Sequence, residues 1–303
     1  MRLGPSGEAA LETAANRFNK LLLVFAALVL LVTALALITG DPSLWWYLTM
    51  LGEEEPYVVL AILVYYTSPS PLTGLAALTS VVASGLLNIA VKYTLNTPRP
   101  PNPLIGVEGP GFPSGHVQVS ASFWTAVTCA HREAGFIALA VSTVVAISLS
   151  RVALRAHYHF DVIGGAALGV LAGLLTHLAA KGGSRARATS VWLAIVALGA
   201  YNALYCGAEL ESTSALLGLG LASTTLLLAP KATTRLDSVA ARLLGFTASS
   251  TLLVAVNTAT LGANAAIRVL GFTLGGVASL SLIPRALVEC SRRCHRARRE
   301  RSA

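Results

Sequence analysis

The chain has 303 residues, of which 54% are hydrophobic and only 12% are charged, and its formal net charge is +8. Ordinary globular domains carry roughly 25% charged residues, so this composition, with a mean hydropathy of +0.68, excludes a typical soluble protein. Long apolar segments are what membrane helices require, and we therefore predict an all-α, polytopic membrane helix bundle.

The first long apolar segment, residues 21–39, contains no charged residue and is long enough to cross the hydrocarbon core. A secretory signal sequence has a shorter apolar region followed by a cleavage site, whereas this segment leads into Asp41-Pro42. We interpret it as a retained helix. Residues 72–91 form a clear later span, but residues 56–67 are so short that their complete crossing is left open.

A proline-rich loop follows at residues 92–115 and contains six of the thirteen prolines, so it is not helical. Three further apolar segments, at 117–130, 134–150 and 162–180, complete a six-span unit. Glycine recurs at every fourth position of the last span, which predicts a close approach by another helix. These glycines are Gly165, Gly169 and Gly173.

A polar, glycine-containing linker at residues 181–188 separates the six-span unit from a second apolar region. We predict two domains, a six-span domain at 1–184 and a four-span C-terminal membrane domain at 185–303 with a basic cytosolic tail. The four additional spans are expected at 189–205, 212–230, 243–262 and 265–283.

The distribution of basic residues predicts the orientation of the chain. If the N-terminus is cytosolic, 17 of the 22 Lys and Arg residues lie inside and five lie outside, as the positive-inside rule requires. We therefore predict a multi-pass cell-membrane protein with both termini in the cytosol. The five basic residues outside are Lys92, Arg99, Arg151, Arg155 and Arg268.

The arginine-rich tail is expected to lie in the cytosol and to bind anionic lipid headgroups rather than nucleic acid, because no aromatic residues for base stacking accompany it. Cys290, Cys294 and His295 lack the fourth ligand of a structural zinc site, so we interpret the cysteines as free thiols. The arginines of this tail are Arg292, Arg293, Arg296, Arg298, Arg299 and Arg301.

Three short segments bring together residue types that suit phosphate chemistry. They contain three cations, two histidines and one carboxylate, and two intervening spans place their loops on the same face of the membrane. Three cations near one point repel one another unless an anion joins them, and a phosphoryl group is the natural anion. The segments are Lys92–Pro100, Pro113–His116 and Ser150–Asp161.

The spacing within these segments predicts individual roles. His157 and Asp161 are four residues apart, so on a helix the carboxylate can fix the tautomer and leave a more nucleophilic ring nitrogen. His116 is then available to protonate the leaving oxygen. Ser114 and Gly115 stand where a helix begins, and the N-terminus of a helix favours an anion.

The pattern Lys-x6-Arg-Pro, then Pro-Ser-Gly-His, then Ser-Arg-x5-His-x3-Asp resembles the type 2 phosphatidic acid phosphatase superfamily. That superfamily includes lipid phosphate phosphatases, undecaprenyl diphosphate phosphatases and the related vanadium haloperoxidases. All three motifs stand here in the family's order and spacing, within the six-span unit. The resemblance says nothing about residues 185–303.

The resemblance implies a role for each matching position and a reaction without a metal or other cofactor. His157 is similar to the nucleophile that becomes phosphohistidine, Asp161 to its orienting partner, and His116 to the general acid. The implied phosphate ligands are Lys92, Arg99, Ser114, Gly115 and Arg151.

We therefore expect a metal-independent phosphatase that acts on a lipid phosphate or diphosphate at the extracytoplasmic face. A polyprenyl diphosphate is the first expectation for the substrate, and phosphatidate-like lipids are the second. A phosphotransferase with the same intermediate remains an alternative, as does a lipid transporter or flippase formed by residues 185–303. Head group, chain length, oligomeric state and the role of the last four spans are left open.

Other polar residues receive structural interpretations. Glu53, Glu54 and Glu55 are expected to form a solvated outer loop, with a gate that repels anions as the alternative. Arg268 is expected to extend to the membrane interface. Arg155 is assigned to a headgroup or an acidic neighbour rather than to phosphate, and His159 is expected to be structural.

Overall fold

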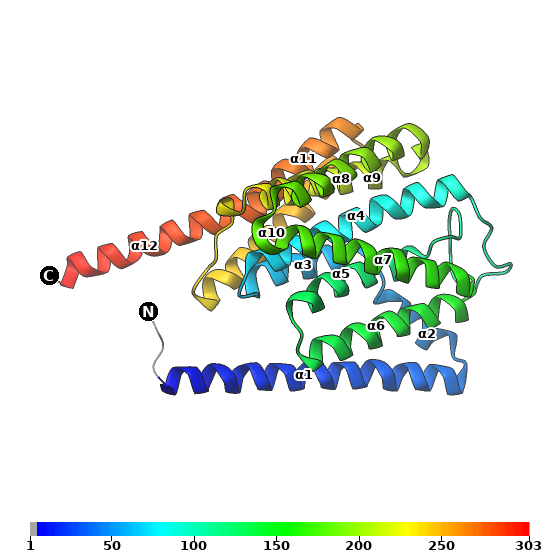
Figure 1. Ribbon diagram of the computed structural model, residues 1–303, viewed down its shortest axis with the longest axis horizontal. Helices are drawn as coiled ribbons and strands as arrows, with labels where there is room; N and C mark the ends of the chain where they lie inside the picture. Colours follow the sequence, from blue (N-terminus) through cyan, green and yellow to red (C-terminus); the bar gives the residue numbers. More distant parts are fainter. Residues whose placement is uncertain (1–4, 303) are drawn as a thin grey trace.

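The computed structural model describes residues 5–302, which form helices joined by short loops and contain no strand (Figure 1). The first half of the chain contains seven α-helices and the second half contains five. In chain order they are α1 (Pro5–Thr39), α2 (Pro42–Met50), α3 (Glu54–Thr67), α4 (Pro71–Leu95), α5 (Gly115–Ala130), α6 (Ala134–Ala153), α7 (His159–Ala180), α8 (Arg185–Tyr205), α9 (Leu210–Leu228), α10 (Val239–Thr260), α11 (Ala265–Val277) and α12 (Ile283–Ser302).

Seven helical segments in the described part of the chain are long and apolar enough to cross a membrane. The three remaining predicted spans coincide with α3, α5 and α9, which are shorter or more polar. Every predicted span therefore corresponds to a helix, and the prediction of an all-α, polytopic membrane helix bundle is confirmed, whereas membrane crossing by α3, α5 and α9 stays a prediction. The chain is a multi-pass membrane protein.

Helix α2 was not predicted from the sequence. Asp41 begins it as an N-cap, accepting a hydrogen bond of 2.8 Å from the Ser43 N–H, and Pro42 occupies the first helical position. Trp45 is buried, whereas Trp46 is half exposed. At nine residues α2 is too short for a span, which is why a search for apolar segments misses it.

Helix α4 lies at the centre of the molecule, because helices from both halves of the chain pack against it. Ile195 of α8 and Leu280 near the C-terminus belong to the same buried apolar cluster as Leu78 of α4. The Asn202 side chain also donates a buried hydrogen bond of 2.9 Å to the Leu86 carbonyl. The two halves therefore share one core, and a domain boundary after residue 184 stays a prediction.

The glycines of α7 form a seam against α5, which confirms the predicted close approach of a second helix. A Cβ atom added at Gly165 would lie 2.6 Å from the Ser114 carbonyl oxygen. One added at Gly173 would lie 2.5 Å from the Ser122 carbonyl oxygen. Only glycine permits this backbone-to-backbone contact, which fixes the start of α7 beside the start of α5.

The expectation that Arg268 extends to the membrane interface is wrong. Its side chain is buried and forms an ion pair of 3.3 Å with Glu211. The guanidinium also donates hydrogen bonds to Asn257 at 2.8 Å and to Thr260 at 3.3 Å, and it lies over the Phe272 ring. Polar groups on two neighbouring helices, α9 and α10, thus compensate a charge whose partners are not apparent in the sequence.

Different helix ends lie at the two ends of the bundle. Figure 1 shows α12 projecting from one end, where α1 also begins, while α4 ends and α7 begins at the other. The side chains of Arg296, Arg298, Arg299 and Arg301 lie outside the described residues, and binding of the tail to anionic lipid stays a prediction.

Candidate active site

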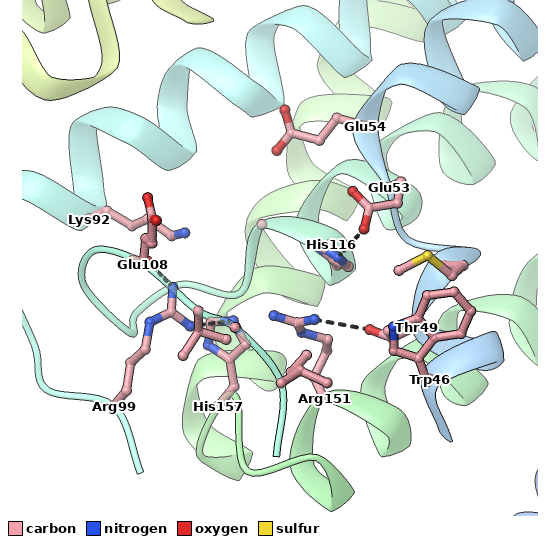
Figure 2. A pocket seen from close by; sticks show the side chains of 15 residues that line it. Trp46, Thr49, Glu53, Glu54, Lys92, Arg99, Glu108, His116, Arg151 and His157 are labelled. Carbon is pink, nitrogen blue, oxygen red and sulfur yellow. Dashed lines mark hydrogen bonds and ion pairs between the residues drawn. The ribbon is translucent and has the colours of Figure 1, made fainter. Parts of the chain in front are cut away.

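The predicted site residues meet at the end of the bundle where α4 and α6 end and α5 and α7 begin (Figures 1 and 2). A cavity of about 360 Å³ opens there. Ser114 and Asp161 are buried in its immediate surroundings. The other six predicted residues line it: Lys92, Arg99, Gly115, His116, Arg151 and His157.

His157 is held between a carboxylate and a cation. Its Nδ1 lies 3.4 Å from Asp161 Oδ2, an electrostatic contact outside hydrogen-bond geometry. Its Nε2 accepts a hydrogen bond of 3.1 Å from Arg99 Nη1, which requires a lone pair on Nε2 and places the proton on Nδ1. Burial, followed by the charge of Arg151, lowers the pKa of His157 to about 2. The imidazole is therefore neutral and presents Nε2 to the cations.

Local backbone geometry holds this pair in place. His157 belongs to the short segment between α6 and α7, and its N–H donates a hydrogen bond of 3.2 Å to the Arg151 carbonyl. Asp161 lies in the first turn of α7, where its Oδ2 accepts a hydrogen bond of 2.9 Å from the Tyr158 N–H. The carboxylate caps α7 and faces the histidine at the same time.

The start of α5 is connected to the start of α7. Ser114 is the N-cap of α5, and its N–H donates a hydrogen bond of 3.0 Å to the Asp161 carbonyl. The Ser114 hydroxyl is buried and has no partner among the described residues. Asn88 supports the turn by donating hydrogen bonds to the Pro113 carbonyl at 3.2 Å and to Gln118 at 2.9 Å. A free hydroxyl at a helix N-terminus suits an anion.

The two arginines of the site have different surroundings. Arg99 donates hydrogen bonds to the carbonyls of Glu108, Gly109 and Ala156 at 2.7 to 2.9 Å, which ties the proline-rich loop to the end of α6. Arg151 Nη1 donates to Thr49 at 3.0 Å, whereas its buried Nε has no partner among the described residues. Arg151 thus has a donor available for a ligand in the cavity.

The expected solvated loop at Glu53, Glu54 and Glu55 is wrong for the first two residues. Glu53 Oε1 lies 3.4 Å from His116 Nε2, and Glu54 also lines the cavity, whereas Glu55 is exposed. The contact with His116 is the largest cause that lowers the pKa of Glu53. Figure 2 shows this pair across the cavity from His157.

Sequence reasoning also missed Trp46, Thr49 and Met50 of α2, which complete the wall of the cavity. These residues stand far from the three motifs in the sequence, so spacing could not reveal them. The only signal was topological, because the loop at Glu53, Glu54 and Glu55 was expected on the outer side, as were the motif loops. Arg155 and His159 are both exposed and do not line the cavity.

The described residues contain no cluster of three or more His, Cys, Asp and Glu side chains able to hold a metal ion. The positively charged groups of the cavity are instead arranged as donors around a space that an anion can enter. Lys92, Arg99 and Arg151 carry the positive charge, and Arg151 Nε and the Ser114 hydroxyl supply unpaired donors. This arrangement can bind and neutralise a phosphoryl group beside a neutral imidazole nitrogen.

Comparison with known proteins identifies the segment that carries this site. Residues 73–185 match the PAP2 superfamily, and this segment contains all eight predicted site residues. A solved structure is also similar, "Crystal structure of the first transmembrane PAP2 type phosphatidylglycerolphosphate phosphatase from Bacillus subtilis", at 24% identity over 52% of this chain and 90% of that chain, with a TM-score of 0.41. A comparison with curated proteins gave no match. The segment that contains the site, residues 73–185, therefore matches the PAP2 superfamily, and the rest of the chain lies outside this match.

Proposed function

We propose that this membrane phosphatase hydrolyses a lipid-linked phosphate or diphosphate through a phosphohistidine formed on His157, without a metal ion. One observation carries the proposal. A buried, neutral imidazole presents Nε2 to a cavity lined by Lys92, Arg99 and Arg151. A nucleophile surrounded by cations is what in-line attack on an anionic phosphoryl group requires.

The geometry supports a two-step reaction. His157 Nε2 attacks phosphorus while Asp161 stabilises the positive charge that develops on the ring. Arg99, which contacts Nε2 in the free protein, turns its donor to a phosphoryl oxygen together with Lys92 and Arg151. His116 protonates the leaving oxygen and then accepts a proton from the water that hydrolyses the phosphohistidine.

The surroundings of the cavity support a lipid substrate. Apolar side chains of Trp46, Met50, Ile105 and Val107 line the cavity beside the charged groups. The catalytic groups stand at helix ends, where a lipid can present its phosphate while its tail stays in the bilayer. A polyprenyl diphosphate is the first candidate substrate, and a phosphatidate-like lipid is the second.

We further propose that the reaction takes place at the extracytoplasmic face. The 17 basic residues assigned to the inside and the five assigned to the outside favour this orientation. Three of those five, Lys92, Arg99 and Arg151, line the cavity. The exceptions to the positive-inside rule are thus largely the proposed phosphate ligands.

Phosphate release by the purified full chain in detergent tests the proposal. Polyprenyl diphosphate, phosphatidate and a soluble sugar phosphate form the substrate panel, with and without EDTA. We expect release from a lipid substrate that EDTA does not stop and that vanadate inhibits. The wild type should also accumulate an acid-labile, base-stable phosphoenzyme.

His157→Ala and His159→Ala form a matched pair, because His159 is exposed two residues away from the proposed nucleophile. We expect the first variant to lose turnover and the phosphoenzyme, and the second to keep both. Appreciable turnover by His157→Ala would overturn the assignment of the nucleophile. Loss of wild-type turnover on chelation, restored by one divalent ion, would overturn the metal-free reaction.

A further inference from the structure

A second pair of a histidine and a carboxylate lies across the cavity from His157 (Figure 2). Glu53 Oε1 is 3.4 Å from His116 Nε2, and both side chains are partly open to the cavity. Glu53 is the N-cap of α3 and therefore lies outside the segment 73–185 that matches the PAP2 superfamily. The carboxylate partner of His116 thus comes from a part of the chain that the family motifs do not include.

The backbone beside this glutamate is shaped to approach His116. A Cβ atom added at Gly52 would lie 2.8 Å from His116 Cβ and 2.9 Å from Ile147 Cγ2, so a larger residue would push the loop away. The Tyr57 hydroxyl donates a hydrogen bond of 2.8 Å to the Leu51 carbonyl and anchors the same loop. The contact between carboxylate and imidazole is therefore built into an ordered turn between α2 and α3.

The charges around His116 define what the carboxylate does. Cations on several elements oppose a positive charge on its ring, whereas the carboxylate in contact with Nε2 stabilises one. The charged and titratable groups around the cavity are Glu53 and Glu54 at the start of α3, Lys92 on α4, Arg99 and Glu108 in the proline-rich loop, Arg151 on α6, and His157 before α7.

We propose that Glu53 is a positioning residue that stabilises the protonated form of His116 and orients it as the proton donor to the leaving oxygen, an inference that rests on the phosphatase function proposed above. Glu53 accepts the Nε2 proton, so the ring presents Nδ1 to the substrate. This arrangement matches the way a carboxylate orients a catalytic or metal-bound histidine in other enzymes.

The proton and electron pairs of the reaction then balance. In the first half, the bond between His157 Nε2 and phosphorus forms, and the phosphorus–oxygen bond to the leaving group breaks. The leaving oxygen keeps that electron pair and takes the proton from His116 Nδ1. In the second half, water attacks phosphorus and gives a proton back to Nδ1, while the electron pair of the nitrogen–phosphorus bond returns to His157.

The dependence on the leaving group tests this role. Dioctanoyl phosphatidate has an alcohol leaving group that needs a proton, whereas p-nitrophenyl phosphate releases a weakly basic phenolate that does not. In the full chain, we expect Glu53→Gln to lower kcat for phosphatidate about 100-fold and to change kcat for p-nitrophenyl phosphate by threefold or less. Glu55→Gln changes the exposed neighbour and serves as the control, with both rates within twofold of wild type.

The pH profile gives a second readout that a purely structural role would not move. Loss of the carboxylate favours neutral His116, so in Glu53→Gln the alkaline limb of kcat for phosphatidate should move to lower pH. Vanadate should still bind within threefold of wild type, which shows that the folded phosphate site is kept. Equal losses on both substrates, or an unmoved alkaline limb, would overturn the inference.

If Glu53→Gln does not bind vanadate, Glu53→Asp replaces it, since the shorter side chain keeps a carboxylate. We then expect a partial loss restricted to phosphatidate and an alkaline limb close to that of wild type. Equal losses on the two substrates would again overturn the inference. Wild-type protein that binds vanadate but releases phosphate from neither of these substrates nor from polyprenyl diphosphate would instead reject the proposed function.

Discussion

Two buried arginines, one in each half of the chain, have nearly the same exposure and very different surroundings. Arg151 at the end of α6 is 5% exposed, and Arg268 in the first turns of α11 is 6% exposed. Arg268 has an ionic partner, two side-chain acceptors and an aromatic ring. Arg151 has one hydroxyl acceptor and a buried Nε without a partner in the described part of the chain.

This difference separates an arginine with a structural role, Arg268, from an arginine that is available to bind a ligand, Arg151. A buried charge is stable only when it is compensated, and the protein itself compensates Arg268. For Arg151 the compensation is incomplete, and it faces a cavity that also contains Lys92 and Arg99. Burial alone therefore does not identify the site, whereas burial together with missing partners does.

Replacement of Arg151, the arginine available to bind a ligand, should have the largest effect. We expect Arg151→Met to reduce phosphate release about 10³-fold, because transition-state charge loses a preorganised donor. Thermal stability should not fall, since an incompletely compensated charge is replaced by an apolar side chain of similar length. Turnover and thermal unfolding of the same detergent-solubilised samples check both parts, and a strong loss of stability would contradict the comparison.

Replacement of Arg268 should show the reverse pattern, a loss of stability with little change in activity. In Arg268→Met, Asn257 and Thr260 lose their donor, which should cost about 1–3 kcal/mol of stability and lower Tm by several degrees. We expect kcat at low temperature to stay within threefold of wild type. A loss of activity without a loss of stability would show that the C-terminal helices take part in catalysis.

A smaller effect is expected from the single acceptor of Arg151. Thr49→Val keeps the shape of the side chain but removes the hydroxyl that accepts the 3.0 Å hydrogen bond. We expect kcat/KM to fall about tenfold, as one neutral partner of a charged group is lost. Thr258→Val on α10 is the matched control, because the hydrogen bonds of its hydroxyl stay within its own helix. Equal effects of the two substitutions would contradict an orienting role for Thr49.

The smallest predicted effect is a pH dependence of stability. The pKa of His157 is lowered to about 2 in the folded protein, against about 6.5 in an unfolded chain. Between these values the unfolded state binds one more proton, so stability is complete above pH 6.5 and falls as the pH decreases. Thermal unfolding of His157→Gln, which lacks this group, should therefore lose fewer degrees than wild type between pH 7 and pH 5. An identical slope would contradict the lowered pKa.

Much of the bundle could be predicted from the sequence, because membrane helices carry their signal in local composition. Apolar length located every span, and the glycine spacing on α7 predicted its contact with another helix. All eight residues predicted from the three motifs likewise gather at the cavity. These features depend on spacing within one segment or between neighbouring segments.

The parts that could not be predicted depend on contacts between distant segments. Thr49 meets Arg151 and Glu53 meets His116 only after α2 and the start of α3 fold over the cavity. Arg268 of α11 likewise forms its ion pair with Glu211 of α9 only in the folded bundle. A polar residue in an apolar sequence looks the same whether it will be solvated or paired, because its partner lies elsewhere in the chain.

The glycine seam between α5 and α7 divides the cavity into a rigid side and an adaptable side. At Gly165, Gly169 and Gly173 the backbone of α7 lies against carbonyl oxygens of α5, so α7 has no side chain at these positions that could be exchanged to change the distance between the helix ends. The opposite side consists of α2, the turn before α3 and the loop around Ile105 and Val107, where side chains alone set the available width. Adaptation to bulkier or slimmer lipids, in evolution or in the laboratory, would therefore proceed by exchanging residues on that second side, while the distance across the seam stays constant.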